Sequence, residues 1–180
     1  MSGKTNNLLT NTILEVQIDF DIIFIQEPPW SIKRSISSSS NKEGEELVGI
    51  PNHPNWITFS RNSTNPQDLL RVITYINIRI SSLHFSLHKN IFDHRDIFLI
   101  SFFNCSSIYS LINIYLDSSQ IALKYLKDIE ANINNDLIMM DNFNIRDSSW
   151  DPLFPNHSIH SNILTDIADT LNLCISSTII

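Results

Sequence analysis

The feature that most constrains the fold is an uncharged, largely apolar stretch from Ile97 to Leu116. It is long enough to cross a bilayer as a helix. Its centre, however, reads Asn104-Cys105-Ser106-Ser107, four small or polar residues between two runs rich in β-branched and aromatic side chains. That pattern is typical of two strands joined by a turn. We therefore predict a hairpin with buried strands over 97–103 and 108–115, and no membrane span.

The composition excludes several classes of protein. The chain has 180 residues, of which 42% are hydrophobic and 17% charged, as expected for a globular domain. Three glycines exclude a Rossmann fingerprint or a P-loop, and two cysteines exclude a disulfide framework or a thiolate zinc site. A net charge of −7 counts against a protein held to nucleic acid by its own charge. Residues 1–12 are polar and lack a secretory h-region, so we expect an intracellular protein, nuclear or cytoplasmic and not secreted.

Strands and helices are mixed along the chain. Two short apolar runs, Ile22–Ile25 and Leu137–Met140, are typical of strands buried on both faces, and we expect them side by side in one sheet. Further strands are predicted over 56–59, 71–78 and 83–87. Helices are predicted from Thr5 to about residue 18, over 118–133 and from Ser161 onward. Each has an inward apolar stripe: Leu9, Ile13 and Val16 in the first, Ile121, Tyr125, Ile129 and Ile133 in the second, and Ile163, Ile167 and Leu171 in the third. The mixture predicts an α/β or α+β sandwich.

Polar residues follow both short apolar runs. Glu27, held by two prolines at a strand exit, is a reasonable hard ligand for Mg²⁺. Asn142 and Asn144 share parity, so their amides could hydrogen-bond a metal-bound phosphate. Arg146 and Trp150 could clamp a nucleic-acid backbone and stack a base. Taken one at a time, Glu27 is better explained as an exposed residue at a strand exit, and the two Asn residues as part of a turn. Trp150 is equally well explained as a cover for the loop against the core.

Two segments together carry a resemblance to a known family. Asp21 to Trp30 reads DIIFIQEPPW, and Asn142 to Pro152 reads NFNIRDSSWDP. This pair resembles the endonuclease/exonuclease/phosphatase superfamily, and more narrowly the endonuclease domain of LINE-type (non-LTR) retrotransposons. Asn113-Ile114-Tyr115 matches the N-x-Y strand that precedes the second motif in that family. The resemblance runs over nearly the whole chain.

The resemblance implies a four-layer α/β sandwich of the deoxyribonuclease I-like type and Mg²⁺-dependent hydrolysis of a phosphodiester in DNA. By position, Glu27 would be the metal ligand and Asn144 would hold the scissile phosphate. Tyr115 would be a further phosphate contact, and Arg146 and Trp150 would contact the substrate. Asn142 falls where the family has its catalytic Asp, the group that positions or deprotonates the attacking water.

Three departures from the family pattern bear on activity. Asn142 keeps the shape of Asp but not its charge or basicity. The family has an earlier strand that bears an Asn, and a closing Ser-Asp-His motif, and the 180 residues contain neither. We therefore expect one partial domain over 1–180, incomplete in its first and last strands, with a polar loop over 31–55. Its stretch from Ser35 to Glu46 is expected to be poorly ordered.

Three hypotheses remain open for the function. The chain is a retrotransposon-derived endonuclease fold that has lost activity, an active Mg²⁺ nuclease or phosphatase with a rebuilt site, or a binding module that keeps only the scaffold. The sequence favours the first over the second because catalytic groups are replaced. It does not separate the first from the third. In either case, incomplete sheets are expected to expose apolar edges that favour self-association.

Overall fold

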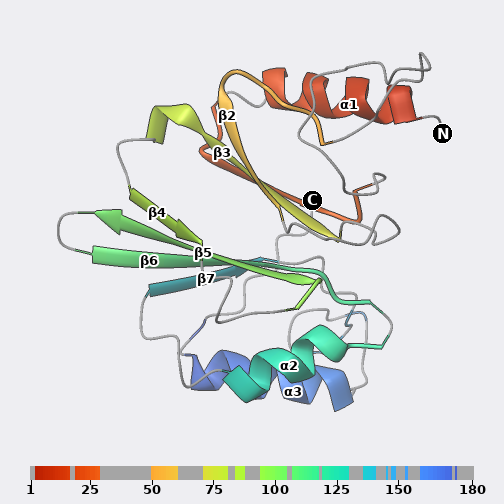
Figure 1. The fold of residues 1–180 in the computed structure, drawn as a ribbon. Coiled ribbons are helices and arrows are strands. Elements are labelled where there is room, and N and C mark those ends of the chain that lie inside the picture. The colour runs from red at the N-terminus through yellow and green to blue at the C-terminus, as the bar shows by residue number, and fades with distance from the viewer. Residues whose placement is uncertain are drawn as a thin grey trace. The chain divides into compact units, whose positions relative to one another are not determined.

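The computed structural model describes residues 3–16, 19–28, 50–60, 71–80, 84–87, 94–104, 107–117, 119–129, 136–140, 145, 147–148, 153, 159–171 and 173. The chain forms two compact units, Met1–His84 and Phe85–Ile180. Each unit contains a sheet, covered on one face by helix, and has a hydrophobic core of its own (Figure 1).

The sheet of the first unit has three strands in the order β1-β3-β2. These are β1 (Ile22–Gln26), β2 (Trp56–Ser60) and β3 (Val72–Asn77), and both pairings are antiparallel. The central strand β3 is buried along its whole length, and it continues into a short 3₁₀ helix, Ile78–Ile80. The helix α1 (Gly3–Val16) packs against one face through Leu14.

Two buried hydrogen bonds fix the core of this unit. The indole Nε1 of Trp56 donates to the carbonyl oxygen of Leu14 over 2.9 Å. That carbonyl lies in the last turn of α1, where no further helical N–H is available to it, so the indole caps the helix. The hydroxyl of Tyr75 donates to the carbonyl of Pro51 over 3.0 Å. Trp56 and Tyr75 therefore tie β2 and β3 to segments that precede both strands.

The first helix lies where the sequence predicted it, but the side of the helix that is buried differs from the prediction. Thr5 lies inside α1 and not at its cap, since the helix begins at Gly3. Ile13 and Val16 are exposed, and Thr10 and Leu14 are buried instead. The two buried residues are four apart and share one side of a helix. The side of α1 that faces the core is therefore the one that carries Thr10 and Leu14, displaced by one residue from the predicted side.

The sheet of the second unit has four strands in the order β4-β5-β6-β7. They are β4 (His84–Leu87), β5 (Ile97–Asn104), β6 (Ser107–Ile114) and β7 (Asp136–Met140). β5 and β6 are antiparallel in a register running from Ile97↔Ile114 to Asn104↔Ser107, which confirms the predicted hairpin. β6 and β7 are parallel, and the connection between them contains α2 (Ile121–Ile129).

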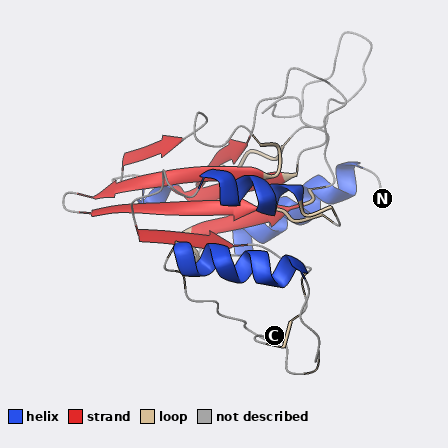
Figure 2. Cartoon of the chain, turned by 90° about the horizontal axis from the view of Figure 1, so that it is seen from below, coloured by secondary structure: helices blue, strands red, loops and turns tan. Residues whose placement is uncertain are grey.

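The helices of the second unit cover one face of its sheet. In both views, α2 and α3 (Ile159–Thr170) lie side by side (Figures 1 and 2). Their buried side chains form one core with alternate residues of the strands. Its buried members are Ile97, Leu99, Ile112, Ile114, Leu116, Ala122, Leu123, Leu126, Ile145, Leu164 and Ile167. None of the helices in the described part of the chain is long and apolar enough to cross a membrane.

Two helix predictions in this unit need correction. In α2, Ile121 is exposed, and the buried stripe is Ala122, Leu123 and Leu126. Helix α3 begins at Ile159, so Ser161 is a buried residue of its first turn and not its cap. The error in α2 arises because several apolar stripes compete on a short helix and only the sheet beneath decides among them. The error in α3 concerns only where the helix begins. The predicted inward side of this last helix is confirmed, because Ile167 is buried in the core and Ile163 and Leu171 pack against it.

The prediction that the two short apolar strands share a sheet was wrong. β1 pairs with β3 in the first unit, and β7 pairs with β6 in the second. Neither strand is buried on both faces. β1 is half-buried along its length, and β7 alternates, with Ile138 and Met140 exposed. Both lie at the end of their sheet among the described residues. Residues 29–49, which include most of the predicted polar loop and all of Ser35–Glu46, lie outside the described residues.

Candidate functional site

Glu27 stands where β1 ends, as the sequence predicted. Its backbone has a φ of 45°, in the left-handed region that residues other than glycine rarely adopt. Its amide N–H donates to the carbonyl of Arg71 over 2.9 Å, which extends the β1–β3 ladder by one step beyond Gln26↔Val72. The turn begins at Glu27 and places its carboxylate at the surface, with 58% of the side chain exposed.

Arg71 is the cationic neighbour of Glu27. The guanidinium Nη1 lies 3.9 Å from Oε1 of Glu27, and only 18% of the Arg71 side chain is exposed. The backbone hydrogen bond between the two residues holds them opposite each other at this end of the sheet. The carboxylate and the guanidinium therefore stay within ion-pair distance without depending on the side-chain rotamers alone.

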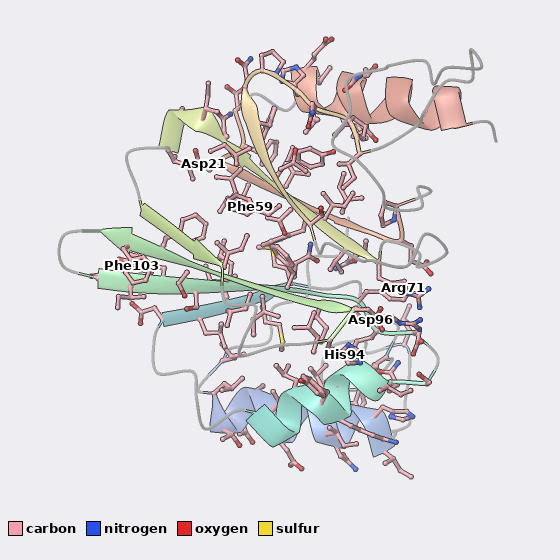
Figure 3. All side chains as sticks on the ribbon, viewed as in Figure 1. Asp21, Phe59, Arg71, His94, Asp96 and Phe103 are labelled. Carbon is pink, nitrogen blue, oxygen red and sulfur yellow. The ribbon has the colours of Figure 1, made fainter. Side chains whose placement is uncertain are left out.

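A second ion pair lies at the other end of β1. The Nε of Arg79 is 2.7 Å from Oδ1 of Asp21, and its Nη2 contacts the carbonyl of Asp19. The backbone amide of Asn77 donates to the carbonyl of Asp21 over 2.8 Å. Figure 3 shows Asp21 and Arg71 at opposite ends of the first unit's sheet. The sheet thus carries one carboxylate–guanidinium pair at each end.

Glu27 provides one hard oxygen ligand of the kind Mg²⁺ takes in proteins. The described part of the chain contains no group of three or more His, Cys, Asp or Glu side chains placed to hold a metal. The group next to Glu27 is a guanidinium, which repels a cation. These residues on their own do not fit a divalent-cation site.

Tyr115 directly follows β6 in the second unit. Its amide donates to the carbonyl of Asp96 over 2.8 Å, and its side chain is half-buried. The bond joins the exit of β6 to the entry of β5, so the position of Tyr115 depends on the segment around Asp96. No described contact assigns the Tyr115 hydroxyl to a phosphate, and that role stays a prediction.

A compact polar cluster surrounds Asp96, whose side chain is only 4% exposed. Arg95 Nε lies 3.5 Å from one carboxylate oxygen, and His94 Nδ1 lies 4.0 Å from the other. The backbone amide of Asp96 also donates to His94 Nδ1 over 3.3 Å. The imidazole lies against the ring of Tyr125 in α2, with the two rings tilted and their centroids 5.1 Å apart. The cluster anchors the start of β5 to the helical layer.

The remaining predicted site residues, Asn142, Asn144, Arg146 and Trp150, lie outside the described residues. Two neighbours are described. Ile145 belongs to the core of the second unit, and Asp147 is buried. The roles given to the four residues therefore stay predictions.

Arg71 and the cluster around Asp96 were missed by the sequence reasoning. Arg71 is separated from Glu27 by more than forty residues, and only the antiparallel register of β1 and β3 brings them together. Only a prediction that β1 and β3 pair in an antiparallel arrangement would have placed Arg71 beside Glu27. His94 and Asp96 precede a strand without matching any catalytic or metal-binding spacing.

Comparison with solved structures identifies the fold. The chain is similar to the endonuclease domain of TRAS1, a telomere-specific non-LTR retrotransposon, with a TM-score of 0.61 and 13% identity. It is also similar to the AP endonuclease LMAP from Leishmania major, with a TM-score of 0.56 and 12% identity. Each match covers 93% of this chain. The chain has the endonuclease/exonuclease/phosphatase fold.

This result confirms the predicted fold class, a mixed α/β protein of the deoxyribonuclease I-like type. The chain spans 67% of the TRAS1 domain and 63% of LMAP. No known family profile and no curated protein matches the sequence. The structural similarity establishes the fold, whereas identities of 12–13% leave activity to be argued from individual residues.

Proposed function

We propose that this chain is a retrotransposon-derived endonuclease fold that has lost phosphodiester hydrolysis. Its likeness to the endonuclease domain of a non-LTR retrotransposon supports the descent. DNA is the substrate class that this descent implies, and Mg²⁺ is the metal. The acidic net charge of −7 makes tight binding to a DNA backbone unfavourable.

The observation that carries the proposal is Asn142. It stands where the resemblance places a catalytic Asp, in the motif Asn142-Phe143-Asn144. An amide cannot accept the proton of an attacking water at neutral pH, and it removes one negative charge from a cation site. Loss of a general base alone commonly lowers a rate by about 10²–10⁴-fold.

The surroundings of Glu27 support the same conclusion. A carboxylate that serves as a metal ligand is most effective when its charge is available to the cation. Here Arg71 lies 3.9 Å from Glu27 and compensates part of that charge. We expect Arg71 to lower the affinity of Glu27 for a divalent cation, whichever residue stands at position 142.

Plasmid nicking tests the proposal. Supercoiled DNA incubated with the purified chain and Mg²⁺ should remain supercoiled, at a rate equal to that of a buffer control. Asn142→Asp should raise affinity for the metal without restoring cleavage, since one substitution returns one carboxylate and leaves Arg71 beside Glu27. Nicking by the unmodified chain that EDTA and Glu27→Ala both abolish would show that the site works.

A non-catalytic interaction module is the second candidate, and β7 supports it. Ile138 and Met140 are about half exposed, at 48% and 50%, on the last described strand of the sheet. Exposed apolar side chains on an edge strand favour pairing with another strand. Self-association through this edge, which the sequence also led us to expect, is the interaction that we propose for it.

A further inference from the structure

We propose that Arg71 is a built-in counter-ion that suppresses divalent-cation binding at Glu27. The inference rests on the proposed role of Glu27 as the family's metal ligand, and it adds a residue that the family motif does not contain. It explains why a glutamate at the expected strand end does not amount to a cation site in this chain.

The geometry makes Arg71 a fixed neighbour. The backbone bond from Glu27 N–H to the Arg71 carbonyl measures 2.9 Å and sets the two residues opposite each other. The Arg71 side chain is largely buried, so the paths open to its guanidinium are few, whereas the carboxylate of Glu27 is mostly exposed. The positive φ of Glu27 constrains the backbone on the other side of the pair. A cation that reaches the carboxylate therefore arrives within a few ångströms of a positive charge.

The size of the effect follows from the charges involved. A divalent ion bound to Glu27 would carry two positive charges near the single charge of Arg71. An ion bound on the side of the carboxylate away from Arg71 would lie about 6–8 Å from the guanidinium, and at an effective dielectric close to that of water the repulsion then weakens binding by roughly five- to tenfold. Added salt reduces the effect, because the carboxylate is exposed. The expected difference is therefore largest at low ionic strength.

The experiment is a Mn²⁺ titration in low-salt buffer, followed by the electron paramagnetic resonance signal of the free ion. Arg71→Met should bind Mn²⁺ about five- to tenfold more tightly than the unmodified chain. Arg71→Lys keeps the charge and should stay within about twofold of it. Glu27→Gln, introduced into Arg71→Met, should abolish the gain. Circular dichroism of each variant checks that the fold is retained.

Arg79→Met is the matched control. It removes the same charge from the same sheet, but at the Asp21 end of β1. It should leave Mn²⁺ affinity unchanged, which separates a local effect from a change in net charge.

Two results would overturn the inference. In the first, Arg71→Met binds Mn²⁺ no better than the unmodified chain, although Glu27→Gln weakens binding; Glu27 is then a ligand that Arg71 does not control. In the second, Glu27→Gln leaves the affinity of Arg71→Met unchanged, and Glu27 is then not the site. Loss of catalysis is tested separately by plasmid nicking, so failure of one proposal is distinguishable from failure of the other.

Discussion

Tyr75→Phe is expected to lower stability at neutral pH and to raise it, relative to the unmodified chain, in strong alkali. Tyr75 is fully buried in the first unit's core, and its hydroxyl donates to the carbonyl of Pro51 over 3.0 Å. Phenylalanine keeps the ring and its packing but removes this donor. The loss of one buried hydrogen bond should reduce the free energy of unfolding by about 1–2 kcal/mol at pH 7.

The alkaline behaviour follows from the pKa of the same hydroxyl. Burial raises the pKa of Tyr75 well above its ordinary value of 10.0, because the phenolate would lose its hydration. Above about pH 10 the unfolded chain releases this proton and the folded chain keeps it. The contribution is therefore fully present below pH 10 and is lost as the pH rises. It falls at about 1.4 kcal/mol per pH unit.

The cost of the lost hydrogen bond and the slope with pH together predict the pH at which the two proteins have equal free energies of unfolding. An advantage of about 1–2 kcal/mol that declines from pH 10 at about 1.4 kcal/mol per unit vanishes near pH 11. Urea unfolding of both proteins at pH 7, 9, 10 and 11, compared as differences, removes the contributions of all other titrating groups. Tyr109→Phe is the control for removal of a phenolic hydroxyl that lies at the surface, because Tyr109 is exposed on β6. A constant Tyr75→Phe difference from pH 7 to 11 would refute the argument from burial.

Two further outcomes follow from the packing. Trp56→Phe should lower the free energy of unfolding by about 2–3 kcal/mol in urea titrations, since it deletes the indole donor to the Leu14 carbonyl and part of a buried ring; a change below about 0.5 kcal/mol would contradict the capping role. Sedimentation at tens of micromolar should show self-association that Ile138→Lys reduces, because a charged side chain blocks an edge strand; a monomer in both cases would speak against an interface at β7.

Local patterns in the sequence were sufficient for most elements of the fold. The hairpin of β5 and β6 follows from two apolar runs around Asn104 and Ser107, and β3 follows from its run of β-branched and aromatic residues. These predictions depend only on neighbouring residues. The choice between Ile13 and Leu14 as the inward side of α1 depends on what lies beneath the helix, and the periodicity of the sequence alone could not make it.

Only those parts of the candidate site that depend on neighbouring residues in the sequence could be predicted. Glu27 was placed at a strand end by the apolar run before it and the prolines after it. Arg71, which changes the electrostatics of that glutamate, comes from a distant segment through strand pairing. The error of placing β1 and β7 in one sheet has the same physical cause, since an apolar run indicates burial but not which strand is its neighbour.

The registers of the two sheets also set different requirements for a chain that emerges gradually from the ribosome. In the second unit, Asn104 pairs with Ser107, so β5 can find its neighbour as soon as the next strand has been made. In the first unit, Ile22 pairs with Ile76, so β1 waits for the synthesis of a segment more than fifty residues further on. Contacts between distant segments form more slowly than local ones. During translation, the apolar side chains of β1 therefore stay without their strand partner until β3 emerges, whereas the β5–β6 hairpin is complete within a few residues.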